Sequence, residues 1–393
     1  MSAHVRYTEG GNTLGPGRVF RYNNRATKEN GGYAMIKAFS AKNFRCFEEL
    51  SLSDLSRLNI IVGQNGAGKT ALLEAIRLAL AGTPNVAFTL NQQRGINFFP
   101  VPLREQFEAQ WNTFFFKFDT ERIISTECED SLGHIASLKV YYEHAKAFTP
   151  MVQQAQPQAQ PTVLLSTIIP VCFERVDFSG TASKLYASVH AQGQGLNLEQ
   201  GQELGQATEF FASSWFLNPG QNAQWFSQLS LENRERELVA AVRDEFGIFV
   251  SDLSVLAPTP FGSSVYATVP FLTQKMQLSL LSAGINKFFS ILAGIMYRRG
   301  GVVLIDEIEN GFYFGKLPSF WKAVMRVANQ YDTQVFATTH SMECLRGLVP
   351  VLADHHQEDV TLLRIERTNG SSGVTSIKGG FFEAALEQNF EVR

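Results

Sequence analysis

The chain has few of the features that define several large classes of protein. It contains only four cysteines, and no two of them form a CxxC pair. A thiolate zinc site or a disulfide scaffold is therefore not expected, whereas a reducing compartment is. Neither sign of charge is in large excess, because 34 Lys and Arg residues accompany 37 Asp and Glu residues. This balance disfavours a constitutively basic nucleic-acid binder but leaves room for a local patch that contacts DNA.

Long apolar runs are also missing. The longest one beside a predicted helix, at 288–297, is too short to cross a bilayer, and the first residues, MSAHV, contain no apolar signal region. We therefore expect a cytoplasmic protein that makes no membrane contact. Its 393 residues, 45% of them apolar and 18% charged, are enough for a sizeable core in two or three lobes.

Composition and spacing divide the chain into four parts. Residues 1–34 are rich in Gly and Asn with little apolar periodicity, which predicts a flexible N-terminal extension. Residues 35–192 are expected to form the first half of the main domain, interrupted by a Gln- and Pro-rich loop at 150–161. A helical insert is expected over 193–258, and residues 259–393 are expected to form the second half of the main domain.

Local patterns predict the elements of this domain. Short apolar runs predict strands and apolar residues at helical spacing predict helices. In the first half these are a hairpin at 36–47, a strand at 59–62, a helix at 70–80, and β-rich runs of a second, antiparallel sheet at 113–118, 122–125 and 137–142. In the second half they are a helical region at 204–249, helices at 277–297 and 318–330, and strands at 302–305 and 334–339. Alternating strands and helices predict an α/β fold with a parallel sheet that is covered on both faces.

A phosphate-binding loop is the most specific motif. The sequence GQNGAGKT follows a predicted strand and opens a predicted helix, so its backbone N–H groups are expected to surround phosphates. Lys69 would reach the β- and γ-phosphate oxygens, and Thr70 would bind Mg²⁺. The expected nucleotide-binding residues of the loop are Gly63, Asn65, Gly66, Ala67, Gly68, Lys69 and Thr70.

Two carboxylates follow the apolar strand at 302–305, and ligands of open α/β sheets lie at such strand ends. Asp306 is expected to hold Mg²⁺ through water. Glu307 is the candidate that orients and deprotonates the attacking water. For Glu309 and Asn310, which come next, ordinary turn chemistry is an equally good interpretation.

Two further motifs are interpreted together with the phosphate loop and the acidic strand end. Ser282 precedes an apolar helix and is expected to cap it, leaving a helix N-terminus that attracts an anion. His340 follows the strand at 334–339, a position at which a lone histidine is usually structural.

Taken together, the motifs at 36–47, 63–70, 281–287, 305–311 and 338–341 resemble the ATPase of the OLD/RecF/SMC-like branch of ABC-type ATPases. The resemblance implies a P-loop NTPase fold of ABC-ATPase type, with a mostly parallel central sheet, an additional antiparallel sheet and a helical insert. It makes GQNGAGKT the Walker A motif and Asp306 and Glu307 the Walker B acids.

The resemblance also implies roles for the two remaining motifs. Ser282 and Gly284 would cap the γ-phosphate bound by an opposite subunit, and His340 would be a catalytic switch histidine that contacts the γ-phosphate. Lys287 stands where relatives carry a basic residue that reaches across the dimer. The chain would then bind ATP and Mg²⁺ and assemble as a homodimer or higher homo-oligomer around the nucleotides.

The sequence departs from the pattern at three places. Tyr313 stands where many relatives have a histidine, and Ala283 and Ile285 replace the second Gly and the Gln of the transporter signature. The Gln-containing loop has no single candidate, so Gln92, Gln93 and Arg94 are all considered.

Spacing separates the branches of the family. The phosphate loop and Ser282 are further apart than in a transporter ATPase, and the chain has neither the coiled coil of SMC proteins nor a Toprim nuclease after His340. The leading hypothesis is an ATPase that acts as a switch or sensor for a separate effector protein, a nuclease or toxin, in prokaryotic anti-phage defence. The alternatives are a RecF-like ATPase of DNA repair and a scaffold that binds ATP without hydrolysing it.

Overall fold

The computed structural model describes most of the 393-residue chain. The described residues are 34–96, 104–150, 167–190, 195–205, 207–213, 219–259, 262–354, 357–368 and 371–381. The predicted N-terminal extension lies outside the described residues except for residue 34, and the predicted Gln- and Pro-rich loop does so except for residue 150.

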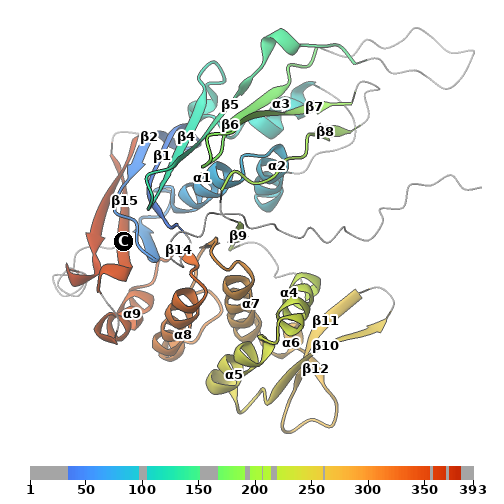
Figure 1. Ribbon diagram of the computed structural model, residues 1–393, viewed down its shortest axis with the longest axis vertical. Helices are drawn as coiled ribbons and strands as arrows, with labels where there is room; N and C mark the ends of the chain where they lie inside the picture. Colours follow the sequence, from blue (N-terminus) through green and yellow to red (C-terminus); the bar gives the residue numbers. More distant parts are fainter. Residues whose placement is uncertain are drawn as a thin grey trace, which may run out of the picture.

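A six-stranded sheet forms the centre of the described part, in the order β16-β15-β3-β14-β13-β9 (Figure 1). Its strands are β3 (Leu58–Gly63), β9 (Thr208–Phe211), β13 (Val302–Ile305), β14 (Gln334–Thr338), β15 (Val360–Thr368) and β16 (Ser371–Lys378). Neighbouring strands are parallel except at the β15–β16 edge. The carboxyl ends of β3, β13 and β14 therefore meet at one edge, where the predicted site residues follow.

Both faces of this sheet are buried, as the continuous apolar runs of its strands require. Leu58, Ile60 and Val62 of β3 pack into a core that includes the helices drawn below the sheet in Figure 1. These helices are α4 (Pro219–Leu231), α5 (Glu235–Phe246), α6 (Leu278–Leu281), α7 (Ala283–Tyr297), α8 (Leu317–Gln330) and α9 (Met342–Asp354). Ile61, which points the other way, joins a second core with α1 (Lys69–Ala81).

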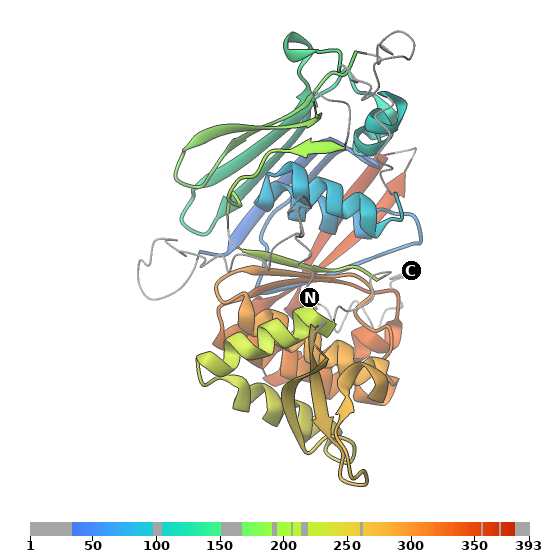
Figure 2. The same cartoon turned by 90° about the vertical axis from the view of Figure 1, so that its right-hand side faces the viewer.

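The second core lies between the central sheet and a seven-stranded antiparallel sheet, with α1 between the two sheets (Figure 2). The antiparallel strands are β1 (Ile36–Phe44), β2 (Phe47–Leu52), β4 (Ile124–Asp130), β5 (Ile135–Tyr142), β6 (Val171–Val176), β7 (Ala182–Val189) and β8 (Leu196–Leu198). The same lobe holds α2 (Pro84–Gln93) and α3 (Arg104–Asn112). The hairpin predicted at 36–47 is confirmed, because β1 and β2 pair antiparallel with Phe44 opposite Phe47.

A third, three-stranded sheet lies beside α4 and α6. It consists of β10 (Asp252–Thr259), β11 (Gly262–Thr268) and β12 (Met276–Gln277). Short 3-10 helices complete the described elements: η1 (Phe116–Phe118), η2 (His144–Lys146), η3 (Phe314–Lys316), η4 (Gln357–Asp359) and η5 (Gly379–Phe381).

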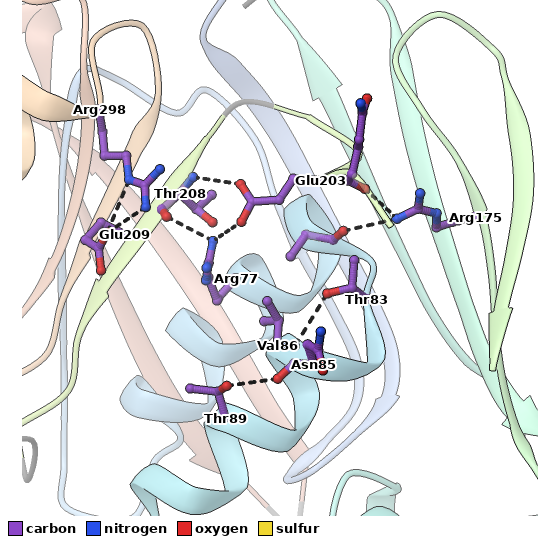
Figure 3. A network of polar contacts seen from close by, with 12 residues as sticks. Arg77, Thr83, Asn85, Val86, Thr89, Arg175, Glu203, Thr208, Glu209 and Arg298 are labelled. Carbon is purple, nitrogen blue, oxygen red and sulfur yellow. Dashed lines mark hydrogen bonds and ion pairs between the residues drawn. The ribbon is translucent and has the colours of Figure 1, made fainter. Parts of the chain in front are cut away.

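A polar network fixes β9 at the edge of the central sheet (Figure 3). Arg77 of α1 donates to Glu203 at 2.9 Å and to the carbonyl of Thr208 at 3.0 Å. Arg298, after α7, donates to Glu209 at 2.8 Å. Both ion pairs are largely buried, so losing one partner would leave a desolvated charge. The network therefore anchors a short edge strand to helices on both faces of the sheet.

The predicted α/β fold class is confirmed: the described residues form a mostly parallel central sheet, covered by helices, and separate antiparallel sheets. Three local predictions need correction. Residues 113–118 form no strand beyond an isolated bridge at Phe115 and the turn η1. Phe114, Phe115 and Phe116 are all buried, so their aromatic run reflects packing and not the alternation of a half-buried strand.

The other two corrections concern the helical regions. The pattern at 204–249 includes β9, a short apolar run that periodicity cannot distinguish from helix. Ser282 has extended backbone angles, φ −166° and ψ 138°, and divides the predicted helix at 277–297 into α6 and α7. The proposed insert at 193–258 accordingly contains two helices together with β8, β9 and most of β10.

Across the part of the chain that the structure describes, no helix combines the length and apolarity needed to cross a membrane.

Candidate functional site

The loop between β3 and α1 has a backbone path that glycine makes possible. Gly63 and Gly68 have φ values of 149° and 112°. A Cβ atom on Gly63 would lie 2.4 Å from the carbonyl oxygen of Ile365, and one on Gly68 would lie 2.7 Å from the sulfur of Cys46. Nothing lies within 4 Å of a Cβ built on Gly66. The loop is therefore packed closely on the protein side and open at Gly66, where a ligand can approach its backbone.

The amino end of α1 offers an anion site. Its N-cap, Gly68, makes no side-chain capping bond, so the first N–H groups of the helix are available to a ligand. Lys69 is folded over the loop and donates to the carbonyls of Gly63 at 2.6 Å and Gln64 at 3.0 Å. Burial lowers the pKa of Lys69, while the nearby carboxylates oppose this shift. The ammonium would leave these carbonyls for the oxygens of a bound phosphate.

Thr70 and Asp306 come from opposite halves of the sequence and meet at the carboxyl edge of the sheet. The Thr70 hydroxyl lies 2.9 Å from Oδ2 of Asp306, and Thr338 donates to Oδ1 of Asp306 at 2.7 Å. The Asp306 residue is only 3% exposed, so its carboxylate is held in one orientation. A hydroxyl and a carboxylate facing one another are the oxygen ligands that Mg²⁺ prefers, with phosphate oxygens and water completing its shell.

Glu307 occupies a turn with a backbone conformation that is uncommon outside glycine, φ 49°. Its N–H donates to the Thr338 hydroxyl at 2.8 Å, and Asn310 donates to its carboxylate. The other carboxylate oxygen lies 3.9 Å from Nε2 of His340. About a third of each of these two side chains is exposed, so both are accessible to solvent. The turn therefore aims the carboxylate toward the histidine.

Glu309 has a structural partner in the same place. Its carboxylate accepts a hydrogen bond of 2.8 Å from the backbone N–H of His340. Asn310, as described above, contacts the carboxylate of Glu307. The turn interpretation of Glu309 and Asn310 thus receives geometric support, because the two side chains orient His340 and Glu307.

The turn at 281–287, called the signature turn below, lies on the opposite face of the central sheet from α1. Ile285 of α7 belongs to the core below the sheet, whereas Leu72 of α1 belongs to the core above it. Ser282 occupies the N-cap position of α7, yet its side chain makes no capping hydrogen bond, contrary to the prediction. It is exposed. A serine at this place without a capping role is free to hydrogen-bond a ligand.

Gly284 packs its backbone against the turn that follows Asp306 and Glu307. A Cβ on Gly284 would lie 2.5 Å from the carbonyl oxygen of Gly311. The neighbouring Lys287 donates to the backbone carbonyl of Glu307 at 2.7 Å. Burial lowers the pKa of Lys287 to about 8, against the opposing effect of Glu309 and Glu307. Lys287 is therefore engaged within its own chain, whereas the resemblance implied a reach across a dimer.

A pocket of about 640 Å³ adjoins Thr70 and Asp306. Its lining includes all three candidates for the Gln-containing loop, and the full set is Thr70, Glu74, Gln92, Gln93, Arg94, Gly95, Phe210, Ala212, Ser213 and Asp306. Arg94 forms a two-pronged contact with Glu74, at 2.6 and 2.9 Å, and Glu74 also lies 2.6 Å from the buried Arg45. The pocket thus places a held arginine beside the proposed metal ligands.

The structure brings the predicted site residues into two groups. The first group lies at the carboxyl edge of β3, β13 and β14 and consists of the loop residues, Lys69, Thr70, Asp306, Glu307 and His340. The second group lies at the start of α7, beside the turn that follows β13, and consists of Ser282, Gly284 and Lys287. Sequence reasoning included Thr338 in the motif at 338–341 but gave it no role, whereas its hydroxyl bonds both Asp306 and Glu307. Its position at the end of β14, opposite β13 in a parallel pair, was the available signal.

Comparison with known families identifies two segments of the chain. Residues 39–149 match a family model described as an AAA domain. Residues 215–346 match a model described as an AAA domain, putative AbiEii toxin, Type IV TA system. The first segment contains the phosphate loop and the second contains the signature turn, the acidic strand end and His340.

Three curated proteins illustrate the relatives to which this chain is similar. An ATP/GTP phosphatase of Helicobacter pylori is 23% identical over 337 residues, which covers 81% of this chain and 89% of that protein. An OLD nuclease of Thermus scotoductus is 54% identical over 46 residues, or 12% of this chain and 8% of the nuclease. A RecF protein of Idiomarina loihiensis is 51% identical over 43 residues, or 11% of this chain and 12% of that protein.

The matches to OLD and RecF proteins thus span short segments, whereas the phosphatase match spans most of both chains. Both family models describe AAA domains, and they cover the two parts of the chain that the sheet brings together. Residues 39–149 and 215–346, which carry the phosphate loop and the acidic strand end, are thus similar to AAA domains, and the shorter matches are to OLD and RecF proteins.

Proposed function

We propose that the protein binds ATP together with Mg²⁺ and hydrolyses it in a site shared by two copies of the chain. The observation that carries this proposal is the meeting of Thr70 with Asp306 at 2.9 Å, directly beside Glu307. These groups lie at the open side of a phosphate loop that ends in Lys69. A metal ligand pair, a base and a cationic anchor are the parts that phosphoryl transfer to water requires.

Each residue has a distinct role in the proposed reaction. Lys69 and the amino end of α1 bind the phosphates, and Thr70 and Asp306 hold the Mg²⁺, which neutralises phosphate charge when bound. Glu307 accepts a proton from water as the water oxygen bonds to the γ-phosphorus and the bond to ADP breaks. In this proposal His340, whose Nε2 lies 3.9 Å from the Glu307 carboxylate, hydrogen-bonds the γ-phosphate.

Assembly around the nucleotide follows from the second group of residues. Ser282 is exposed at the start of α7 and makes no capping bond, and α7 lies on the other face of the sheet from the phosphate loop. In the proposed homodimer, or a higher homo-oligomer, Ser282 and Gly284 of one copy bind the γ-phosphate held by Lys69 of the other. Each ATP would then be enclosed by two copies.

The biological role proposed for the protein is a cytoplasmic switch that controls a separate effector, a nuclease or toxin, in anti-phage defence. The model that matches residues 215–346 is described as an AAA domain, putative AbiEii toxin, Type IV TA system, and this description supports a connection to toxin systems. Identifying the protein that co-purifies with the chain tests it. A nuclease or toxin supports the role, and recombination factors contradict it.

A role in DNA repair is the second candidate, favoured by the RecF match. It predicts that duplex DNA stimulates ATP hydrolysis, with a steep loss of stimulation as salt is raised. A scaffold that binds but does not hydrolyse ATP is disfavoured by the presence of Glu307 in a turn that aims its carboxylate.

The substitution Glu307→Gln tests the hydrolytic site. We expect ATP to remain bound while turnover falls on the order of 10²-fold or more, because the base is lost and the binding groups stay. Turnover and bound nucleotide are measured side by side. Glu366→Gln, at an exposed position of β15, is the matched control and should hydrolyse at the parent rate. Parent-rate hydrolysis by Glu307→Gln would place the base elsewhere.

A further inference from the structure

We propose that Lys287 is a positioning residue for the catalytic glutamate of its own chain, and that it does not act on the nucleotide site of the partner copy. Its ammonium anchors the backbone carbonyl of Glu307 and so maintains the turn that aims the Glu307 carboxylate. The inference deepens the proposed function and rests on it.

The contact is short and specific. Nζ of Lys287 lies 2.7 Å from the Glu307 carbonyl oxygen, which also accepts a bond of 3.1 Å from the N–H of Asn310. The N–H of Glu307 is bonded to Thr338 at 2.8 Å. Both backbone groups of the residue are thus fixed, one by the neighbouring strand end and the other chiefly by α7.

The anchored residue needs such support. Glu307 has a φ of 49°, a left-handed conformation that residues other than glycine adopt rarely and that persists where the surroundings impose it. With this backbone conformation, Asn310 approaches one oxygen of the Glu307 carboxylate and His340 approaches the other. Removing the ammonium would release the turn without removing any group that contacts the nucleotide.

The packing around Lys287 keeps it near its own chain's turn. One helical turn before it, Gly284 is so close to Gly311 that a Cβ would meet the Gly311 carbonyl at 2.5 Å. Asn286 is buried and accepts a hydrogen bond of 3.2 Å from Asn222 of α4. The start of α7 therefore packs against the turn at 306–311, called the acidic turn below, on one side and against α4 on the other.

The first test compares binding with turnover in Lys287→Met, which keeps the apolar stem and removes the donor. We expect kcat to fall about ten- to a hundredfold, the effect of losing one charged hydrogen bond, with KM and ATP affinity nearly unchanged. Lys287→Arg, which can donate to the same carbonyl, should recover most of the rate. Lys139→Met, at an exposed position of β5, is the matched control. A rise in KM with kcat unchanged would overturn the proposal.

The second test asks on which chain Lys287 acts, by mixing variants of the full-length protein. Lys69→Ala inactivates the phosphate loop of its chain, so a mixed dimer has one active site, which combines the loop of the other chain with the signature of the Lys69→Ala chain. If Lys287 serves its own Glu307, mixing Lys69→Ala with Lys287→Met restores no activity. Mixing the double variant Lys69→Ala/Lys287→Met with parent protein should leave the same activity as mixing Lys69→Ala with parent.

The opposite outcomes, recovery in the first mixture and loss in the second, would show that Lys287 reaches across the dimer. Mixing Lys69→Ala with Ser282→Arg provides the reference, because the proposed shared site predicts recovery there. Failure of that reference, with subunit exchange demonstrated, would contradict the shared site. The ratio of kcat to KM effects in Lys287→Met would still decide whether the residue positions the base.

Discussion

The phosphate loop and the signature turn are both built at the start of a helix, but they differ in how their polar groups are used within one chain. At the phosphate loop, Lys69 bonds two loop carbonyls and Thr70 lies against Asp306. At the signature turn, the exposed Ser282 caps nothing, although it occupies a capping position. The comparison indicates that the polar groups of one helix start have partners within the chain, while the other start has an exposed hydroxyl that makes no capping bond.

The largest effect is expected at the phosphate loop. Lys69→Ala should lower ATP affinity on the order of 10²-fold or more, because an ammonium that would contact the phosphate oxygens is lost. Binding of ATP with Mg²⁺ is measured by titration, with Lys139→Ala as a control at an exposed lysine. Unchanged ATP affinity would contradict the assignment of residues 63–70 as a phosphate loop. The difference drawn above between the starts of α1 and α7 would then no longer hold.

Complementation sharpens the contrast at the level of assembly. Lys69→Ala and Ser282→Arg should each be inactive, and an equal mixture should recover about a quarter of the parent turnover. Half of the dimers are then mixed, and one of the two sites in each carries no lesion. If the mixture recovers no activity, two explanations remain: each subunit hydrolyses ATP by itself, or the two sites of a dimer are strictly coupled. A covalently linked mixed dimer separates these two cases.

Packing between the signature turn and the acidic turn should affect stability. Gly284→Ala forces a Cβ against the Gly311 carbonyl, so we expect a loss of about 1–3 kcal/mol in the free energy of unfolding. Gly373→Ala, where nothing lies within 4 Å of the new Cβ, is the matched control and should change stability little. Chemical denaturation measures both. Equal stabilities would mean that the two turns are not in tight contact.

The smallest effect is expected at Ser282 itself. Since its side chain does not cap α7, Ser282→Ala should change the free energy of unfolding by less than about 0.5 kcal/mol while lowering ATP turnover. Thr83, whose hydroxyl accepts from Val86 at the start of α2, provides the comparison, and Thr83→Ala should cost about 1 kcal/mol. A loss at Ser282 as large as that at Thr83 would restore the capping interpretation.

The parts of the site that the sequence predicted are those built from contiguous residues. The motif GQNGAGKT requires a strand before it and a helix after it, and β3 and α1 stand there with bounds close to those expected. The acidic strand end was equally visible, because a buried parallel strand is a continuous apolar run and the acids follow it directly. Local chemistry of this kind depends little on the rest of the fold.

The predictions of secondary structure were wrong where apolar or aromatic residues pack against residues distant in the sequence. The run at 113–118 looked like a strand, but Phe114 and Phe115 are buried in the core between the two large sheets, and Phe116 is buried beside them. β9 was hidden in a helical pattern, because its identity as a strand depends on pairing with β13, about ninety residues later. Burial makes the two states alike in sequence, and only the packing partner distinguishes them.

The sequence by itself therefore determined that this chain has a phosphate loop, an acidic strand end and an α/β fold to hold them. The tertiary structure decided how those pieces act on one another. It placed Thr338 against both acids, turned Lys287 toward the Glu307 carbonyl and left the hydroxyl of Ser282 uncapped. These contacts join residues from different elements, and their distances follow from strand order and helix packing, which no local pattern encodes.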